Sequence, residues 1–460
     1  MCAIKIPVLA IIAAGLAMLP GGRALAAGDA MAVAEAYNAS GAALFQQLSG
    51  ASGNIVLSPL SVGTAMAMTL SGARGETARE MASVLHQRLD RAAMEAGNAA
   101  LAAALGRYDQ SAVAPRCPQG LQADMRPSGA RCRGAVPASG TCLYPATREG
   151  DACVAPGSFP PSARLLNADA LMLSGRGDLV APDYAALLKD QYGAEILRNA
   201  SLDDVNGWVK RKTEGKIDRI LGQIDHSVVA VILNAVYFKA KWAEVFAKNA
   251  TKEVAFNLSP QRKVEVATMR LGARFAVVAR PLYRALRLPY QIGQLGMIVV
   301  LPNEIGGLDE VGKRFEGNEW AKLATDLHAP DAIKSVDLAL PRFKASYEAS
   351  LVPRFQAAGM TLAFDLKRAD FSGMTGKPPA QVPFAIGSIM HRAVVEVMED
   401  GTEAAAATAV TVVTAAMPRE QPPPPEPFHV DRPFLFAIID DATGAVLFQG
   451  RVVDPRSPPP

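Results

Sequence analysis

Residues 397–416 read VMEDGTEAAAATAVTVVTAA, and this stretch decides the fold. With the period of two of a β-strand, alternate residues from Thr402 to Thr414 form one uncharged face, while Glu403 lies on the other face. The small side chains of the uncharged face offer little steric resistance to entry between two other strands, and a charge buried there would cost several kcal/mol. The stretch is therefore predicted to be a tethered strand that can join a sheet. A flexible linker or a frayed helix is the competing interpretation, because short apolar runs fit both periods.

Strands and helices are predicted on both sides of this stretch. The run over 390–398 leads into it as a strand, and the prolines between Pro418 and Pro427 exclude a central strand after it. Helical spacing predicts helices over 30–48, 60–70 and 75–85. Further strands are predicted over 228–239, 294–301, 335–341, 434–439 and 445–452. Helices early in the chain and long strands later indicate the α+β class.

Composition and motifs exclude several classes of protein. Half of the 460 residues are hydrophobic, so a fully disordered or fibrous chain is excluded. The 47 Lys and Arg against 44 Asp and Glu leave a net charge of +3, which argues against a nucleic-acid-binding surface. No G-x-S-x-G elbow, H-E-x-x-H helix or Walker A loop is present, and the five His are scattered. We therefore predict no enzyme, no metal site and no cofactor; a peptide hydrolase is disfavoured because no nucleophile–base–orienter set is visible.

The N-terminus has the features of an export signal. Lys5 precedes an apolar run over 6–19, helix breakers follow at 20–22, and Ala24-Leu25-Ala26 fits a signal peptidase site. The run is shorter than the roughly 20 residues of a spanning helix, so an uncleaved anchor is the alternative. We expect a signal peptide over 1–26, a mature chain without membrane contact, and a secreted or periplasmic location.

Residues 109–163 differ in composition from the rest of the chain. They are rich in Gly, Pro, Ser and Arg and lack apolar periodicity, which predicts a surface insertion, either an extra module or a disordered loop. In an exported chain its cysteines are expected to form two disulfides, with three pairings open. The four are Cys117, Cys132, Cys142 and Cys153. A zinc site is the alternative, but there is no C-x-x-C pair and no neighbouring His.

The stretch EDGTEAAAATAV, residues 399–410, resembles the hinge of the serpins, the serine protease inhibitor family. Other stretches resemble the same family in order and spacing, over roughly residues 30–455 outside the insertion. They are NIVLSPLSVGTAMAMTLSGARGETAREM (54–81), VNGWVKRKTEGKI (205–217), ILNAVYFKAKWAEVF (232–246), LALPRFKASYEASLVPRFQAAGM (338–360) and DRPFLFAIIDDATGAVLFQGRVVDP (431–455). A serpin domain is accordingly expected over 27–455, with a Pro-rich tail over 456–460. An Ala-, Pro- and Arg-rich composition with a signal suggests an exported bacterial member.

The resemblance implies an α+β serpin fold with three β-sheets, about eight to nine helices and an exposed reactive-centre loop. It also implies a monomer that acts as a suicide substrate. A target serine protease attacks the loop and forms a covalent acyl-enzyme, and the cleaved loop then enters the main sheet as a new strand. A non-inhibitory serpin that serves as a binding or carrier protein is the alternative, but the uniformly small hinge argues against it.

The resemblance also assigns roles to single residues. Gly401 matches the hinge glycine, and Glu399 matches an acidic residue at the top of the main sheet. The hinge set is Glu399, Gly401, Thr402, Glu403, Ala404, Ala405, Ala406, Ala407 and Thr408. The polar cluster that controls sheet opening is matched by Ser58, Ser61, Asn234 and His391. Trp242 matches the residue where the loop first enters. From the residues alone, Ser58 is a helix cap, His391 a structural histidine and Trp242 a core residue.

The reactive bond is predicted from loop length. Inhibitory serpins usually place the cleaved residue fourteen positions after the hinge glycine, which here is Ala415, followed by Ala416. A small residue suits an elastase-like or subtilisin-like protease. Met417 and Arg419 are the alternatives; they lengthen the loop by two and four residues and suit elastase- or chymotrypsin-like and trypsin-like targets.

The insertion carries a further partner prediction. It follows a region where some animal serpins bind polyanions, and its first half, up to residue 135, contains four arginines. These are Arg116, Arg126, Arg131 and Arg133. Binding of a polyanion or a surface is one interpretation, and a solvated polar loop is the other.

Overall fold

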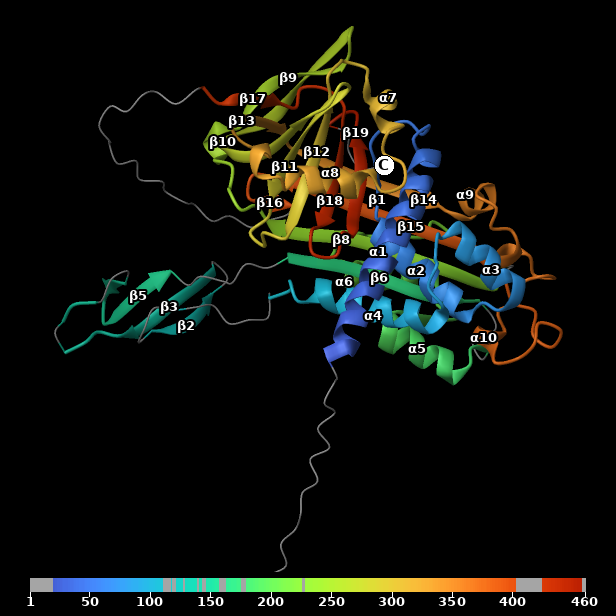
Figure 1. Ribbon diagram of the computed structural model, residues 1–460. Coiled ribbons are helices and arrows are strands. Elements are labelled where there is room, and N and C mark those ends of the chain that lie inside the picture. Colours follow the sequence, from blue (N-terminus) through green and yellow to red (C-terminus); the bar gives the residue numbers. More distant parts are fainter. Residues whose placement is uncertain are drawn as a thin grey trace, which may run out of the picture.

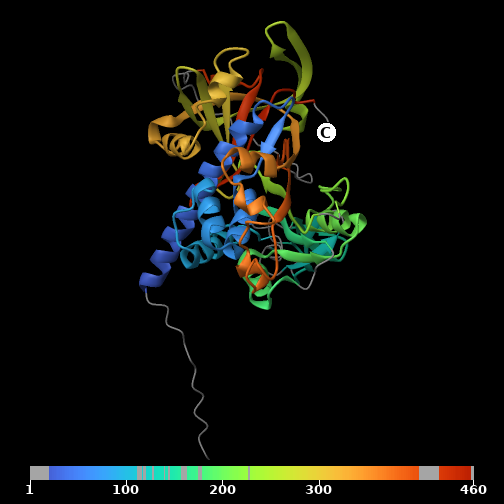
Figure 2. The same ribbon diagram turned by 90° about the vertical axis from the view of Figure 1, so that its right-hand side faces the viewer.

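The computed structural model describes most of the chain in several ranges. They are 20–110, 117, 121–126, 129–138, 140–142, 146–156, 163–174, 179–225, 228–402 and 424–456, with the backbone alone at 20–27, 123–131 and 156. These residues form ten α-helices and three β-sheets, which confirms the predicted α+β class. The largest sheet lies at one end of the molecule, and α2 to α6 gather toward the other (Figure 1, Figure 2).

The helices follow the predicted spacing in the first part of the chain. They are α1 Pro20–Leu48, α2 Pro59–Gly72, α3 Gly75–Val84, α4 Arg91–Gly106, α5 Pro182–Tyr192, α6 Leu202–Lys212, α7 Leu308–Gly312, α8 Glu319–Leu327, α9 Val352–Ala357 and α10 Ser372–Thr375. The helix expected over 30–48 is the second part of α1, which begins earlier, inside the predicted signal peptide. Nearly all of α2 is buried, as its apolar sequence predicts. None of the helices in the described residues is long and apolar enough to cross a bilayer.

A six-stranded sheet forms the middle of the molecule. In spatial order its strands are β14 Phe343–Ser350, β15 Ile386–Met398, β16 Gly401–Thr402, β8 Ala230–Lys241, β6 Ala163–Leu173 and β7 Glu195–Arg198. The central strands β8 and β15 also pair directly and in parallel, from Ala230 and Ile386 to Tyr237 and Val394. One face carries α6, whose Trp208 packs in a cluster with residues of β6 and β8. This sheet contains the strand predicted from the VVAVILNAVYFK run.

A nine-stranded sheet holds most of the other predicted strands. It consists of β1 Ile55–Leu57, β19 Val446–Val452, β18 Phe434–Asp440, β12 Leu295–Pro302, β11 Tyr283–Pro289, β10 Arg262–Ala279, β13 Ile333–Pro341 and β17 Glu426–His429, with β9 Lys252–Ser259 paired to β10. The β18–β19 hairpin is buried along its length because both faces are covered. Pro427 lies in β17, an edge strand, where the missing N–H is tolerated.

The insertion forms the third sheet. Its strands are β2 Gln122–Arg126, β3 Gly129–Ala135, β5 Ala152–Pro156 and β4 Thr147–Glu149, in that spatial order. The lobe projects sideways from the body between α4 and β6 (Figure 1). At its base, the Ala163 N–H donates to the Tyr108 carbonyl at 3.0 Å. Of the two sequence interpretations, an extra module is therefore the one that the described part of the insertion supports.

Close packing around β19 provides a test of the strand register. Gly450 pairs with Val56 and Phe436, and a Cβ placed on it would lie 2.5 Å from the Ile55 carbonyl oxygen and 2.6 Å from the Phe436 ring. We expect Gly450→Ala to lower the free energy of unfolding by about 1–3 kcal/mol through overpacking, measured as a lower urea midpoint. Gly272→Ala in β10 is the matched control, because no atom lies within 4 Å of the added Cβ. An unchanged midpoint for Gly450→Ala would contradict the register.

Candidate functional site

The six-stranded sheet, called the main sheet below, is split at one end, where β8 and β15 diverge. Their direct pairing stops at Tyr237 and Val394, and β16 occupies the space beyond. Thr402 pairs with Val397 of β15 on one side and with Ala240 of β8 on the other, antiparallel to both. The first two residues after the Glu399-Asp400 turn therefore already form a strand of the sheet.

Gly401 is required by the geometry of this short strand. Its φ is 153°, and a Cβ on it would lie 2.1 Å from the Ala240 carbonyl oxygen and 2.7 Å from the Lys241 Cα. Only a residue without a side chain permits this approach to β8. A steric reason thus accompanies the match of Gly401 to the hinge glycine.

Two stacked aromatic rings lie beside the strand. The Trp242 Nε1–H donates to the Met398 carbonyl at 2.9 Å, and the indole stacks on the Tyr290 ring with 4.5 Å between centroids. The Tyr290 hydroxyl is hydrogen-bonded to Thr402 Oγ1 at 2.8 Å. The structure therefore places Trp242 at the entry to the sheet. Sequence reasoning missed Tyr290, because a lone tyrosine at the end of a strand carries no signal of its own.

Glu399 is anchored below the surface at the turn. Arg342 donates from Nε to Glu399 Oε1 at 2.7 Å, and the Thr251 hydroxyl donates to the same oxygen at 2.5 Å. Burial by itself raises the pKa of the Glu399 carboxyl, but the hydrogen bonds from Arg342 and Thr251 outweigh it and the pKa is lowered. The N–H of Phe246 also donates to the Glu399 carbonyl at 3.0 Å. Arg342 and Thr251 were missed because only the fold brings them to the turn.

The four residues predicted to control sheet opening form one buried network. The His391 Nδ1–H donates to Asn234 Oδ1 at 2.5 Å, and Asn234 Nδ2 donates to Ser61 Oγ at 2.6 Å. The Ser58 N–H donates to His391 Nε2 at 3.4 Å, while its hydroxyl donates to the Leu447 carbonyl at 2.6 Å. Ser58 also caps α2 by accepting from the Ser61 N–H. Asn234 and His391 are register partners, so the network crosses the boundary between β8 and β15.

Two residues of β6 complete the network and were not anticipated. Asn234 Nδ2 and Asn167 Nδ2 each donate to the carboxylate of Asp169, and the Ser61 hydroxyl donates to Asn167 Oδ1 at 2.7 Å. Among the described residues, no Lys or Arg forms an ion pair with Asp169. Burial therefore raises its pKa to about 7 against these hydrogen bonds, while burial lowers the pKa of His391 to about 3. The two polar residues at alternate positions of an apolar strand were the available sequence signal.

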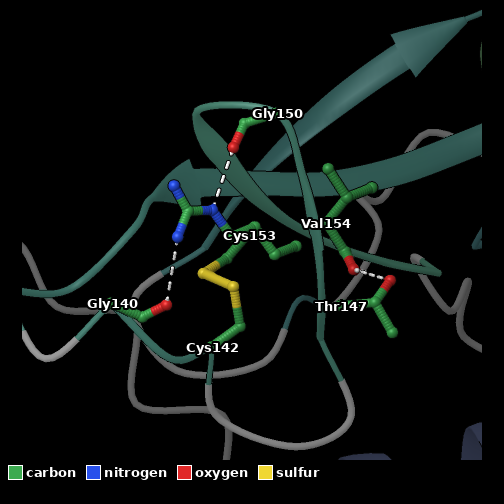
Figure 3. The surroundings of a disulfide bond; sticks show 7 residues. Gly140, Cys142, Thr147, Gly150, Cys153 and Val154 are labelled. Atoms are coloured by element: carbon green, nitrogen blue, oxygen red, sulfur yellow. Dashed lines mark hydrogen bonds between the residues drawn. A yellow bond between two sulfur atoms is a disulfide. The ribbon is translucent and has the colours of Figure 1, made fainter.

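The structure selects one of the three disulfide pairings. Cys117 is bonded to Cys132, and Cys142 to Cys153. Beside the second bond, Arg148 donates to the carbonyl of Gly150 at 3.0 Å (Figure 3). The first bond joins β3 to the segment before β2, and the second joins β5 to the segment between β3 and β4.

The arginines of the insertion are only partly described. Arg133 pairs with Asp151 at 3.1 Å, and both side chains are exposed. Arg116 and the side chains of Arg126 and Arg131 lie outside the described residues. Binding of a polyanion there stays a prediction.

The remaining site predictions fall on 403–423, outside the described residues. They are Glu403, Ala404, Ala405, Ala406, Ala407 and Thr408 of the hinge, and Ala415, Ala416, Met417 and Arg419 at the reactive bond. The described chain resumes just before β17, at the edge of the nine-stranded sheet.

Comparison with known proteins identifies the family. The model of the serpin (serine protease inhibitor) family matches residues 35–117 and 162–455, which is most of the chain. The chain belongs to the serpin family. Members of this family are protease inhibitors and not enzymes. The family match omits 118–161, which hold all four strands of the insertion, β2 to β5.

The serpin is similar to several mammalian proteins. It is 31% identical to the leukocyte elastase inhibitor A of Mus musculus over 90% of this chain and 96% of the mouse protein. It is 30% identical to the leukocyte elastase inhibitor of Homo sapiens over 88% and 93%. Among solved structures, human kallistatin shares the fold with a TM-score of 0.71, 24% identity, and 94% and 100% of the two chains covered.

Asp169 and His391 have opposite effects on stability as pH changes. The folded pKa of Asp169, about 7, lies above its unfolded value near 4, so its contribution is present at acid pH and lost as pH rises through about 7. The folded pKa of His391, about 3, lies below its unfolded value, so its contribution is present above about pH 6.5 and lost as pH falls toward 3. Between about pH 4 and 6.5 the two slopes cancel.

Removal of either group should therefore expose the slope of the other. As pH falls from about 6.5 to about 4.5, we expect Asp169→Asn to lose about 1.4 kcal/mol of stability per pH unit relative to the unaltered protein. His391→Gln should gain stability with a similar slope. Urea unfolding at the two pH values measures both, with Asp203→Asn, an exposed carboxyl on α6, as the control. Parallel pH profiles for all four proteins would contradict the opposed titration.

Proposed function

We propose that this serpin is a suicide inhibitor that traps a serine protease by inserting its cleaved loop between β8 and β15. The observation that carries the proposal is β16, because its two residues already occupy the first positions of that strand. Thr402 is fully buried between β8 and β15. In the sequence from Thr402 to Thr414, every second residue is uncharged, so one face of an extended strand there carries no charge. The hinge is thus in register for further insertion.

The direction of the central strands favours insertion. Because β8 and β15 are parallel, a strand that enters in the direction of β16 is antiparallel to both. One parallel ladder is exchanged for two antiparallel ladders, which pair somewhat better per residue. At about 1 kcal/mol net for each added hydrogen bond, plus burial of the valines, a dozen residues gain roughly 10–20 kcal/mol. A strand from Glu399 to Ala415 is about 50 Å long, enough to carry an attached protease along the whole sheet.

The buried polar network supports a closed state before cleavage. Asn234 and His391 bond to each other directly across the β8–β15 boundary. An inserted strand would separate these two side chains, so the bond must break as the sheet opens. The proposed mechanism requires this behaviour, because the sheet must stay closed until the hinge moves further between β8 and β15.

The proposed reactive bond is Ala415–Ala416. The catalytic serine of the protease would attack the Ala415 carbonyl, form an ester with it and release a new N-terminus at Ala416. A small residue at the attacked position supports an elastase-like or subtilisin-like target, and the mouse and human relatives are both named as leukocyte elastase inhibitors. Met417 and Arg419 are the neighbouring alternatives.

We also infer that the serpin acts outside the cytosol, in a secreted or periplasmic location. Its two disulfides support this location, because such bonds persist in oxidising compartments. The signal-like segment over 1–26 and the Ala-, Pro- and Arg-rich composition support an exported bacterial source.

The mechanism and the bond can be tested together. The mature protein is mixed separately with elastase, subtilisin, chymotrypsin and trypsin, and each mixture is separated on a denaturing gel. With elastase or subtilisin, we expect an SDS-stable band at the summed mass of serpin and protease. The released fragment should have the mass of a chain that begins at Ala416. Cleavage in the loop without such a band would indicate a non-inhibitory serpin for those proteases.

A hinge variant should separate cleavage from trapping. Thr402→Arg places a charge at a fully buried position that touches Tyr290, which should displace β16 and block insertion. We expect the protease to cleave this variant at the usual rate while the stable complex falls at least tenfold. Thr325→Arg on the exposed side of α8 is the matched control and should trap normally. Normal trapping by Thr402→Arg would contradict entry of the hinge between β8 and β15.

A further inference from the structure

The segment that follows α6 lies across the boundary between β8 and β15. The Lys216 ammonium is 5.6 Å from the ring centroid of Tyr237 on β8 and 4.0 Å from the carboxylate of Glu396 on β15. Further along, Arg392 of β15 donates from Nη1 to the Arg219 carbonyl at 2.7 Å. These contacts connect the two sides of the line along which the loop would enter.

A basic cavity opens beside these contacts. Its volume is about 370 Å³, and its lining includes Lys216, Arg219, Lys344 and Arg392. The one acidic residue in the lining, Asp218, pairs with Lys210 at 3.0 Å. The side chains that line the cavity are therefore mainly basic, although Lys216 and Arg392 have the carboxylates of Glu396 and Glu348 as partners beside it.

Part of this positive charge is uncompensated. Within the described ranges of the chain, the side chains of Arg219 and Lys344 have no acidic partner within 4.0 Å. Arg392 pairs with Glu348 at 3.1 Å, yet its buried Nε–H has no acceptor in the same described residues. Cations and a free donor around one hollow favour an anion that accepts several charge-assisted hydrogen bonds.

We propose that this cavity binds an oxyanion with two or more negative charges, a phosphoryl or sulfate group, and that the bound anion holds the main sheet closed. Lys216 and Arg219 belong to the segment that follows α6, and Lys216 also lies over Tyr237 of β8, whereas Lys344 and Arg392 belong to β14 and β15. An anion shared by both pairs forms a bridge that ties this segment to β14 and β15. Binding follows from the cavity alone, while the effect on trapping rests on the proposed function.

The consequence for inhibition follows from the position of the bridge. The bridge must be released before the loop can insert along the sheet, whereas the attack of the protease on the loop does not require the sheet to open. A bound anion therefore slows insertion and leaves the attack of the protease unchanged. More acyl-enzyme is hydrolysed before it is trapped, so more serpin is consumed for each protease inhibited.

Binding is tested first, with the mature protein and inorganic phosphate, pyrophosphate or sulfate at constant ionic strength in chloride. We expect pyrophosphate to raise the melting temperature in a saturable way, and Arg219→Gln with Lys344→Gln to weaken binding at least tenfold. Lys263→Gln, an exposed residue of β10, removes a charge elsewhere and should bind as the unaltered protein does. Saturable binding of sulfate as well identifies a site for either oxyanion, and binding of the phosphates alone identifies a phosphoryl site. No saturable shift with any probe, or equal shifts in the double variant, would overturn the site.

The effect on trapping is measured next, as moles of serpin consumed per mole of protease inhibited. We expect saturating pyrophosphate to raise this ratio at least twofold in the unaltered protein and to leave it unchanged in the double variant. An unchanged ratio in both, with binding confirmed, would overturn the closing role. If no stable complex forms in chloride alone, the proposed function fails, and the binding measurement still decides the anion site.

Discussion

The parallel pairing of β8 with β15 is the constraint on which the rest of the structure depends. Two parallel central strands leave the sheet open to a third strand that runs the other way, and β16 takes that position for two residues. The tight approach of Gly401 to β8 and the buried Thr402 follow from this entry. The same pairing brings Asn234 opposite His391, so a buried polar bond crosses the line of entry.

A polar pair, Asn234 with His391, interrupts the largely apolar register pairs along that line. An apolar contact would hold the strands together without direction, whereas a hydrogen-bonded amide and imidazole hold one register and are lost together when the strands separate. Asp169 extends the network to β6, where burial favours a neutral carboxyl beside a neutral imidazole. At the split end, hydrogen bonds from Arg342 and Thr251 instead lower the pKa of Glu399 and favour its ionised form. These bonds anchor the turn that precedes the short strand β16.

Much of this arrangement could be predicted from local sequence. The small, uncharged face after Gly401 indicated an insertable strand, and Ser58 before Pro59 indicated the cap that the structure shows. The strands around Asn234 and His391 were predicted within a few residues of their observed ends. The partners Tyr290, Arg342 and Thr251 could not be predicted, because each reaches the site from a strand or turn whose own pattern says nothing of its neighbours across the sheet. Asp169 alternates with Asn167 in an apolar strand, which marks it as unusual, but that pattern does not place it beside Asn234.

The sequence by itself determined the class of fold, because periodicity, glycine and small residues act locally, and it predicted where the hinge lies and how far the insertion over 109–163 extends. Tertiary structure decided which cysteines pair, since four cysteines in one segment permit three arrangements and only the fold of that segment selects one of them. It also decided that the described part of the insertion forms a sheet, that Asp169 is buried with no Lys or Arg paired to it among the described residues, and that four basic side chains line one cavity. These features depend on contacts between residues far apart in the chain, which no local pattern encodes.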